Sequence, residues 1–408
     1  MKIRLISNGT QESKNDSKCR RRSRMKKILY LHAGAEMYGA DKILLELVEG
    51  IDKSKYKPIV ILPEHGVLAE TMKQKKIDVR ILPYPIVRRK YFTLVGILRF
   101  LFAYVFFSFK LVNLVKSENI QLVHVNTTAV WEGAFIKMFA HVKVIWHVHE
   151  IILHPQVVYK VICFLLQHFS DQVIAVSEAT ASNLTKNGLV DSAKVSVVHN
   201  GIDSDLVVAD SKSSVRNRLG IQSGDVIIGM VGRINAWKGQ EDFLDAVIPI
   251  IQESDNVHAL IIGSPYQGEE QRLVQLKDKI DVCPNSVQKR IKVIPFQKNI
   301  AEYYAAFDVF VLPSTSPDPF PTVVLEAMAN ALPIVGYNHG GITEMVVDGQ
   351  NGTLVSPGVT SLLSNAISDL VGDKDLRQKY GLVSEQRQNQ LFDLGQFVKT
   401  FEKIYNQE

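Results

Sequence analysis

The chain of 408 residues is too long for one ordinary hydrophobic core, so we expect two domains of about 200 residues each. Hydrophobic residues make up 46% of the chain and charged residues 22%, a composition that excludes an intrinsically disordered protein. The net charge of +5 comes from the first 24 residues and leaves the rest of the chain close to neutral, so we expect no nucleic-acid partner.

Residues 1–24 carry eight Lys or Arg against two acidic residues. This composition predicts a basic disordered extension, with contact to an anionic surface as the alternative. The stretch 25–30 is typical of a chain start that runs into a strand, and we expect a chain that begins at Met25 to keep full activity. The start lacks the apolar core and cleavage site of a signal peptide, which favours a cytoplasmic location.

Three cysteines, Cys19, Cys163 and Cys283, lie far apart in the sequence and have no paired spacing. This spacing predicts neither a disulfide framework nor a zinc site. A reducing compartment agrees with that usage of cysteine.

Apolar runs alternate with helical patterns through the first half of the chain. The runs predict buried strands at 27–32, 58–62, 79–82, 122–125, 143–148 and 172–176. Repeated alternation of strand and helix predicts a parallel sheet with right-handed crossovers. Ligands of such a sheet bind at the carboxyl ends of its strands.

The segment 92–115 is strongly apolar but is interrupted by Arg99 and Lys110. On a helix, these two residues fall within about 60° of Asn113 and Ser117, which leaves a wide apolar face. The charges argue against a membrane-spanning helix. Two interpretations remain: a core-facing helix of the first domain, or an interfacial helix on an anionic membrane, with residues 88–116 as the contact and the basic run 88–90 at its start.

His147 and His149 alternate at the end of the predicted strand 143–148, so both point to one face of the sheet. The pattern His-x-His also suits a metal, with Glu150 and His154 as further candidate ligands. A metal-dependent hydrolase that uses His147 and His149 is therefore one alternative function, although it would leave the motifs of the second half unused. We expect no metal.

The first alternating pattern ends near the turn-forming Asn200-Gly201, and a polar stretch follows. We expect an N-terminal domain at 25–205, a C-terminal domain at 206–385, and a C-terminal helix at 386–408 that crosses back to the first domain. The sequence Asp203-Ser204-Asp205 is like a metal-binding Asp-x-Asp, but its place in the interdomain turn favours a turn and helix cap.

A second alternating set predicts strands at 226–231, 258–262, 292–295, 309–312 and 333–336. The predicted fold class is therefore α/β, with two doubly wound parallel-sheet (Rossmann-like) domains and an interdomain cleft. The loop after the first strand of this set contains Arg233 and Lys238. Arg can bind a phosphate through two hydrogen bonds and Lys adds a point charge, so we interpret this loop as a phosphate site rather than as solvated charges.

The strongest local motif lies between 314 and 335, where Asp318 precedes Glu326 by eight positions. Prolines hold Asp318 on an extended loop, and Pro321 or Thr322 suits the start of a helix. The backbone N–H groups of Thr322 and Val323, together with the positive end of the helix dipole, suit a diphosphate. The carboxylates beside it can accept hydrogen bonds from sugar and ribose hydroxyls.

These motifs resemble those of the family-four retaining glycosyltransferases of the GT-B fold, which are found widely in bacterial polysaccharide and glycolipid synthesis. The resemblance covers nearly the whole chain from Met25. Its motifs are Tyr38-Gly39-Ala40-Asp41, His149, Asn200-Gly201-Ile202-Asp203, Gly232-Arg233, Lys238-Gly239, Asp318 to Glu326, and Gly340-Gly341-Ile342-Thr343-Glu344.

The resemblance implies a retaining, metal-independent hexosyltransferase without a cofactor, whose donor is a nucleoside-diphosphate sugar, UDP or GDP. The implied acceptor is a lipid-linked saccharide, and the implied location is the cytoplasmic face of the cell membrane. The implied catalytic residues are His149, Asp318 and Glu326. The implied donor-binding residues are Gly39, Arg233, Lys238, Thr322, Val323 and Glu326.

The resemblance also implies which part of the donor each residue contacts. Arg233 and Lys238 would neutralise the pyrophosphate, and such prearranged cations can stabilise a departing nucleoside diphosphate without a metal. Asp318 would bind sugar hydroxyls, Glu326 the ribose, and His149 would lie against the donor sugar.

Two parts of the chain depart from the family pattern. Asp318 stands where the family usually has Glu, and Pro321, which has no N–H to donate, replaces a usual Gly. In the first loop, Tyr38 and Asp41 replace a Gly and a Glu. These departures favour a further alternative, a nucleotide-sugar-binding protein with weak or lost turnover.

Overall fold

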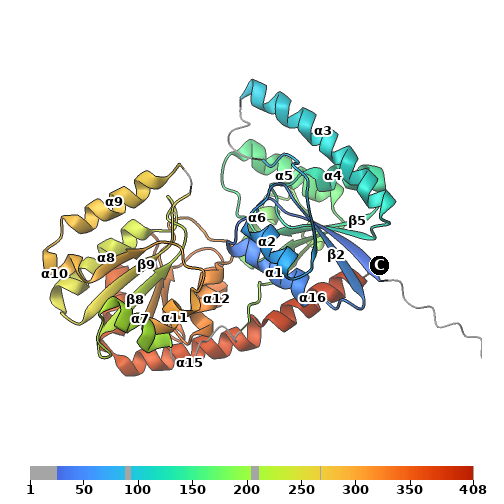
Figure 1. Ribbon diagram of the computed structural model, residues 1–408. Helices are drawn as coiled ribbons and strands as arrows, with labels where there is room; N and C mark the ends of the chain where they lie inside the picture. The colour runs from blue at the N-terminus through green and yellow to red at the C-terminus, as the bar shows by residue number, and fades with distance from the viewer. Residues whose placement is uncertain (1–24, 88–92, 204–210, 267, 408) are drawn as a thin grey trace, which may run out of the picture.

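The computed structural model describes residues 25–87, 93–203, 211–266 and 268–407. Two α/β domains, the first blue to green and the second yellow to orange, are visible in Figure 1. The predicted extension 1–24, the predicted boundary between 205 and 206, and the basic run 88–90 lie outside the described residues.

The first domain contains a seven-stranded sheet in the order β3-β2-β1-β4-β5-β6-β7. Its strands are all parallel; for example, Tyr30 of β1 pairs with Val60 of β2 and His124 of β4. The carboxyl ends of β1, β4 and β5 therefore meet at one edge of the sheet. The strands are β1 Lys26–Leu31, β2 Tyr56–Leu62, β3 Asp78–Ile81, β4 Leu122–Val125, β5 Lys143–Val148, β6 Gln172–Ala175 and β7 Val195–Val197.

Helices cover both faces of this sheet. Successive residues of β1 alternate between two cores, with Ile28 and Tyr30 in one and Leu29 and Leu31 in the other. Strands buried on both faces need continuous apolar runs, which is why the sequence predicted them. The helices are α1 Gly39–Gly50, α2 Val67–Gln74, α3 Leu94–Ser117, α4 Glu132–Ala140, α5 Gln156–Phe169 and α6 Glu178–Thr185.

The second domain has a six-stranded parallel sheet in the order β10-β9-β8-β11-β12-β13. The strands are β8 Val226–Val231, β9 Val257–Ile262, β10 Ile291–Ile294, β11 Val309–Leu312, β12 Ile334–Tyr337 and β13 Gly352–Val355. The helices are α7 Ser211–Leu219, α8 Gln240–Glu253, α9 Glu270–Asp281, α10 Asn285–Gln288, α11 Ala301–Ala306, α12 Thr322–Ala329, α13 Ile342–Met345, α14 Thr360–Gly372 and α15 Lys374–Leu391. The predicted fold class, two Rossmann-like parallel-sheet domains, is confirmed.

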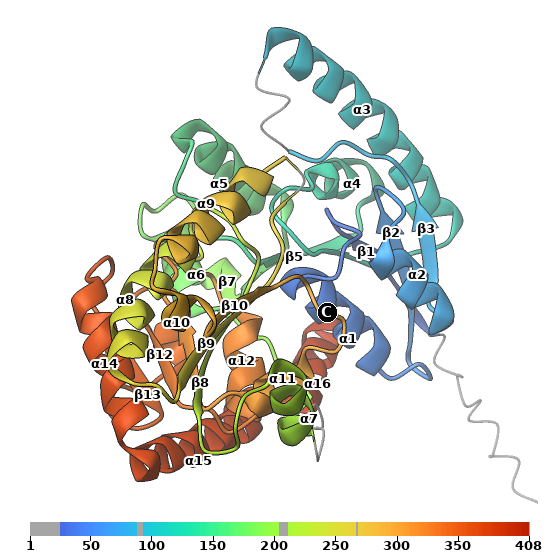
Figure 2. The ribbon, with the colours of Figure 1, turned by 60° about the vertical axis from the view of Figure 1, so that its left-hand side comes forward.

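The chain returns to the first domain through its last helix, α16 Leu394–Asn406, which is drawn in red beside α1 (Figure 1; Figure 2). Phe397, Phe401 and Tyr405 are buried there. The Tyr405 hydroxyl lies 2.7 Å from Nδ1 of His124 and 3.2 Å from the Tyr30 hydroxyl. Side chains from the end of the chain thus complete the core of the domain in which the chain begins.

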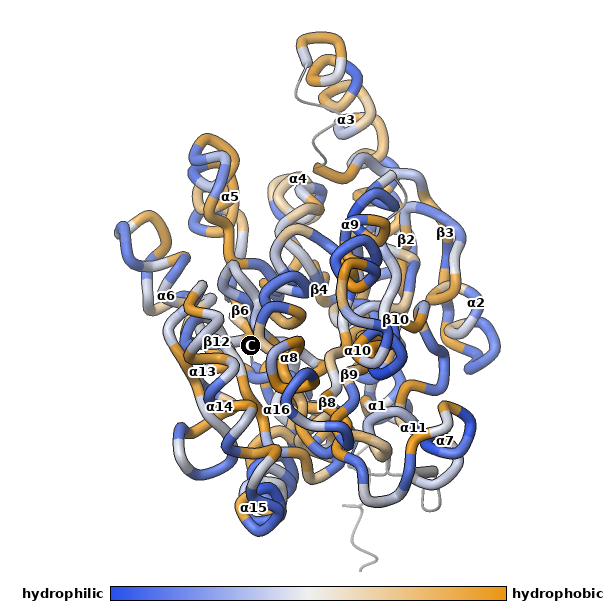
Figure 3. Tube along the Cα trace, turned by 90° about the vertical axis from the view of Figure 1, so that its left-hand side faces the viewer, coloured by the Kyte–Doolittle hydropathy of each residue, from blue (hydrophilic) through white to orange (hydrophobic). Residues whose placement is uncertain are grey.

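Helix α3 is buried on one side only. Its C-terminal half packs on the first domain through Leu111, Val112 and Val115. Its N-terminal half reaches outward from the first domain and is mostly hydrophobic (Figure 3), with Leu98 68% exposed and Phe102 77% exposed. Among the described residues, α3 is the one helix long and apolar enough to span a membrane, and 28% of its most apolar window is buried.

Candidate functional site

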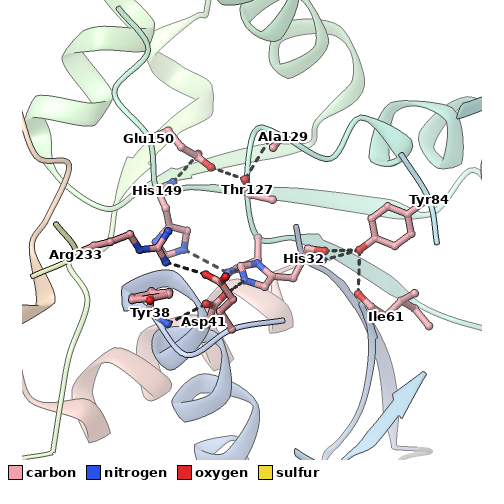
Figure 4. Close-up of polar contacts among 12 residues, drawn as sticks. His32, Tyr38, Asp41, Ile61, Tyr84, Thr127, Ala129, His149, Glu150 and Arg233 are labelled. Carbon is pink, nitrogen blue, oxygen red and sulfur yellow. Dashed lines mark hydrogen bonds and ion pairs between the residues drawn. The ribbon is translucent and has the colours of Figure 1, made fainter. Parts of the chain in front are cut away.

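The first residue after each of three neighbouring strands carries a polar side chain: His32 after β1, Asn126 after β4 and His149 after β5. Nδ2 of Asn126 lies 3.2 Å from Nδ1 of His32, and Oδ1 of Asn126 lies 3.3 Å from Nε2 of His149 (Figure 4). Burial lowers the pKa of His149 to about 3, so its ring is neutral near pH 7.

Asp41 joins this cluster to the start of α1. Its Oδ1 lies 2.6 Å from Nε2 of His32, and its Oδ2 accepts a hydrogen bond of 2.9 Å from the Tyr38 N–H. Burial by itself would raise the pKa of Asp41, but the contacts with His32 and Tyr38 lower the pKa by a larger amount. The pKa of this carboxyl is therefore below its usual value. Asp41 is therefore a carboxylate that caps the helix and holds the His32 ring.

Arg233, in the loop after β8, contacts the first loop of the other domain. Its guanidinium lies over the Tyr38 ring, 3.3 Å from the centroid, and over the Tyr266 ring, 3.6 Å from the centroid. Nη2 of Arg233 donates to Oε2 of Glu36 at 2.9 Å. The predicted phosphate-binding arginine thus lies at the junction of the two domains, between two aromatic rings.

Lys238 forms an ion pair with Asp318, and both side chains are mostly buried. The loop that carries Asp318 is held by the Gly340-Gly341 turn, where the Gly341 N–H donates to the Asp318 carbonyl at 2.7 Å. Gly340 has a φ of +70°, and a Cβ there would lie 2.5 Å from the same oxygen. Glycine at this position therefore permits the close approach that fixes Asp318.

Glu326 lies in the second turn of α12 and is buried. Its Oε1 accepts from Nζ of Lys42 at 2.8 Å, and its Oε2 accepts from the Tyr304 hydroxyl at 2.8 Å. It faces a cavity of about 620 Å³ that both domains line. The other lining residues are Met37, Lys42, Ile43, Glu46, Ile202, Lys298, Asn299, Ile300, Ala301, Glu302, Tyr304, Thr322 and Asn330.

The helix starts of α1 and α12 lie side by side at the mouth of this site. A Cβ added to Gly39 would lie 3.2 Å from Oγ1 of Thr322. Among the described residues no side chain caps α12, and its N-cap Pro321 has no N–H, so Thr322 and Val323 carry the first free donors. The dipole of α12 and the two nearby cations favour an anion here.

The structure brings Arg233, Lys238, Asp318, Glu326 and the Gly39–Thr322 contact to the junction of the two domains. His149 belongs to the hydrogen-bonded cluster at the sheet edge, which Asp41 connects to the same helix start. The roles of these residues stay predictions.

Four residues of the site were not predicted from the sequence: Glu36, Lys42, Tyr266 and Tyr304. Lys42 comes directly after the Tyr38–Asp41 motif, and this was the one signal that could have marked it. The other three lie outside the motifs, and their contacts join distant parts of the chain.

Two further sequence features have a structural place. Glu344 of the Gly-Gly-Ile-Thr-Glu motif accepts from the N–H groups of Glu178 and Ala179 at the start of α6, at 2.9 and 3.0 Å, and so caps a helix of the other domain. His147 is fully buried, with its ring 4.9 Å from that of Phe401. Within the described part of the chain, no three His, Cys, Asp or Glu side chains are grouped as metal ligands.

Comparison with known sequences shows two matches that follow each other along the chain. The family model "Glycosyltransferase Family 4" matches residues 37–206, and "Glycosyl transferases group 1" matches residues 211–387. D-inositol 3-phosphate glycosyltransferase of Nocardia farcinica is 27% identical over 220 residues, which are 52% of this chain and 48% of that protein. The capsular polysaccharide biosynthesis glycosyltransferase CapM of Staphylococcus aureus is 26% identical over 238 residues, 57% of this chain and 61% of that protein.

The chain spans about half the length of the curated relatives it matches, whereas solved structures match over nearly its full length. HepE of Anabaena, in complex with UDP and glucose, has a TM-score of 0.81 and 25% identity, and the match covers 94% of this chain and 100% of HepE. WaaG, a glycosyltransferase involved in lipopolysaccharide biosynthesis, has a TM-score of 0.68 and 13% identity, over 94% of this chain and 100% of WaaG, and supports the fold alone. The two domains, their order and the two family matches show that the chain belongs to the family-four glycosyltransferases of the GT-B fold.

Proposed function

We propose that the protein transfers a sugar from a nucleoside-diphosphate sugar to a saccharide acceptor in the synthesis of a cell-surface polysaccharide. The observation that carries this proposal is the convergence of Arg233, Lys238 and the start of α12 beside a cavity that contains Glu326. CapM, a relative, is a capsular polysaccharide biosynthesis glycosyltransferase, and HepE binds UDP-glucose, which supports this donor class.

The donor diphosphate would bind between Arg233, Lys238 and the N–H groups of Thr322 and Val323. In the structure, the carboxylates of Glu36 and Asp318 pair with the two cations. A diphosphate offers both cations a stronger acceptor, with more charge and more oxygens. As the bond to the sugar breaks, the same groups stabilise the negative charge that develops on the leaving nucleoside diphosphate, and no metal is needed for that step.

The nucleoside would enter the cavity in front of Glu326. The carboxylate can accept hydrogen bonds from the two ribose hydroxyls. These hydroxyls would replace the Lys42 ammonium as the donors to Oε1. Tyr304 holds the second oxygen from behind and fixes the orientation of the carboxylate. UDP is the donor nucleotide we favour, since HepE at 25% identity is solved with UDP.

Asp318 and His149 would bind the transferred sugar, Asp318 after release from Lys238 and His149 through its neutral ring. Retention of the anomeric configuration, with attack on the face that the diphosphate leaves, is the stereochemical course we propose. Its support is family membership, and the acceptor hydroxyl would then pass its proton to the departing phosphate.

The exposed apolar side of α3 would rest on an anionic membrane, and the acceptor would be a lipid-linked saccharide. The support is the exposed apolar surface of α3, which continues onto α4: the Phe109 and Phe139 rings lie 6.0 Å apart, and both side chains are exposed. Lys110 lies 4.5 Å from the centroid of the Phe106 ring, so a cation accompanies the apolar surface. This placement would make the protein peripheral on the cytoplasmic face.

The donor proposal is tested by thermal-shift measurements with UDP, GDP, ADP and TDP. A nucleotide that binds the folded protein at about 100 times its Kd adds about 2.7 kcal/mol of stability, which raises the unfolding midpoint. We expect UDP to raise it most, and Lys238→Ala to abolish the shift. Absence of a shift with all four nucleotides would remove the donor assignment.

Turnover is tested with the same donor as a sugar nucleotide. Wild-type protein should hydrolyse or transfer the sugar, and Glu326→Gln, which keeps the size but weakens the acceptor of the ribose hydroxyls, should lose most of that rate. Equal background rates in both proteins, with nucleotide binding retained, would identify a binding protein instead of an enzyme. Activity lost with EDTA and restored by zinc would favour the metal-dependent hydrolase.

A further inference from the structure

His149 is held by a chain of hydrogen bonds that ends at a buried carboxylate. The chain runs from Asp41 to His32 at 2.6 Å, from His32 to Asn126 at 3.2 Å and from Asn126 to His149 at 3.3 Å (Figure 4). His32, Asp41 and Asn126 are all buried, whereas His149 is partly exposed. This series of hydrogen bonds thus connects three buried side chains to the partly exposed ring of His149.

The direction of each hydrogen bond follows from the carboxylate. A carboxylate only accepts, so Nε2 of His32 donates to Oδ1 of Asp41. In a neutral ring Nδ1 of His32 then carries the lone pair, and it accepts from the Nδ2 amide of Asn126. That orientation leaves Oδ1 of Asn126 to accept from Nε2 of His149. A neutral imidazole has one N–H, so Nδ1 of His149 keeps a free lone pair.

Gly34 and the Tyr38 N–H fix the position of the Asp41 carboxylate. A Cβ at Gly34 would lie 2.9 Å from Oδ1 of Asp41, so glycine at 34 leaves room for the carboxylate to reach His32. Oδ2 of Asp41 is held at the same time by the Tyr38 N–H. Both oxygens are therefore fixed, and the carboxylate cannot turn away from His32 without releasing the start of α1.

We propose that Asp41, His32 and Asn126 are positioning residues that hold His149 as its neutral Nε2–H tautomer and so present Nδ1 to the transferred sugar as a hydrogen-bond acceptor. The ligand chemistry is a sugar hydroxyl that donates to this nitrogen. Nε2 of His149 donates to Oδ1 of Asn126, whereas Nδ1 forms no hydrogen bond with another residue that the structure describes. The proposal rests on the proposed function, because it needs a sugar at the site.

The tautomer is measured directly by ¹⁵N NMR of the protein labelled at histidine, with the His149 signals assigned from His149→Gln. The expected spectrum of the full-length protein shows a protonated Nε2 and an unprotonated Nδ1 at pH 7. A His149 ring protonated at Nδ1 instead would overturn the proposal, because it would mean that the Asn126 amide has the opposite orientation. This measurement needs no activity and stays informative if no transfer is found.

Asp41→Asn tests the effect on turnover. It keeps the shape of the side chain but removes the charge that fixes the His32 tautomer. We expect kcat to fall roughly ten- to hundredfold, while the KM for the donor and the thermal shift with UDP stay near wild type. Asp41→Glu, which restores the carboxylate that the family usually has here, should recover most of the loss.

A matched control is Asp78→Asn, which removes the partner of Arg80 on β3, away from the site, and should keep the wild-type kcat. An Asp41→Asn variant with unchanged kcat would overturn the positioning role. A wild-type protein without UDP binding or transfer would refute the proposed function instead, and the NMR result would then still decide the tautomer.

Discussion

Charged side chains at the junction of the two domains are paired with one another. Arg233 is held by Glu36, Lys238 by Asp318, and Glu326 by Lys42. In the pairs of Arg233 and of Glu326, the partner is a group that the donor would displace. In the pair of Lys238 with Asp318, both groups are assigned to the donor, and they would separate when it binds. If the donor binds as proposed, its affinity depends on these pairs as well as on the contacts with the ligand.

Glu36→Gln should strengthen UDP binding, because it removes the carboxylate that competes with the diphosphate for Arg233. The Glu36 side chain is 61% exposed, so solvent screens the pair and the gain should be modest, about two- to fivefold in Kd. Isothermal titration calorimetry at low and high salt measures it, and the gain should shrink with salt. Glu70→Gln, an exposed glutamate on α2, is the matched control. Weaker binding by Glu36→Gln would mean that Glu36 contacts the ligand favourably.

Glu132, the first residue of α4, is a fully buried acid outside the donor site. Burial raises the pKa of Glu132, and the backbone N–H groups of Trp131 and Glu132 lower it by a smaller amount. The resulting pKa is about 8. A folded-state pKa above the unfolded value means that stability is fully present below about pH 4.5 and is lost as the pH rises toward 8.

Glu132→Gln should therefore unfold at a higher temperature than wild type at pH 8.5, since glutamine does not ionise, and should show no such gain at pH 5. Thermal unfolding followed by circular dichroism at the two pH values checks this. Glu70→Gln should follow wild type at both. A gain of the same size at pH 5 would show that ionisation is not its cause.

At the scale of elements, α3 has more exposed large apolar side chains than any other described helix of the first domain, from Leu94 at its start to Phe109. We expect the full-length protein to float with vesicles of phosphatidylcholine and phosphatidylglycerol at low salt. Leu98→Gln combined with Phe102→Gln should largely abolish flotation, because both side chains are more than two thirds exposed and burial of each in lipid would contribute roughly 1.5–3 kcal/mol.

The matched control is the pair Val274→Gln and Val282→Gln, two exposed apolar residues of the second domain, which should leave flotation unchanged. The substitutions on α3 should also leave the UDP thermal shift unchanged. A wild-type protein that stays with the soluble fraction at low salt without detergent would contradict the membrane proposal.

The sequence predicted elements best where burial is complete. Strands such as β8 and β11 are buried along their full length and appeared as apolar runs. It missed β7 and β13, which have three and four residues and are mostly half-buried, so their apolar signal is weak. The apolar pattern of the sequence predicted the length of α3. It could not show whether a protein core or a membrane covers the apolar face, because amphipathic spacing does not identify what packs against a helix.

The candidate site was predictable only within each domain. The loop with Arg233 and the pair Asp318 and Glu326 follow strands and open helices, so their place could be inferred from the order of elements. Lys42 on Glu326 and Glu36 on Arg233 could not, because these contacts depend on how the two domains face each other. The neutral His149 also depends on burial, which no spacing in the sequence reveals.

At the scale of the whole molecule, α16 brings the end of the chain back to the first domain and packs on its sheet. The face it covers contains His124 and His147, both fully buried. Burial lowers the pKa of His124 to about 3 and holds that of His147 well below its usual value. Both rings are therefore neutral in the folded protein at pH 6, whereas in the unfolded chain they are largely protonated.

Lower pH should therefore decrease the stability of the packing between α16 and the first domain. Since both folded-state pKa values lie below the unfolded value of 6.5, the stability contribution of the two histidines is present above pH 6.5 and is lost as the pH falls toward 3. His147 lies against Phe397 and Phe401, with ring centroids 6.5 and 4.9 Å away, so an apolar residue suits its place. His147→Leu should consequently show a smaller drop in unfolding midpoint between pH 7.5 and pH 5 than wild type, and His65→Leu, an exposed histidine, should show the wild-type drop. If His147→Leu and wild type lost stability in parallel, the acid sensitivity would have to come from groups outside the interface with α16.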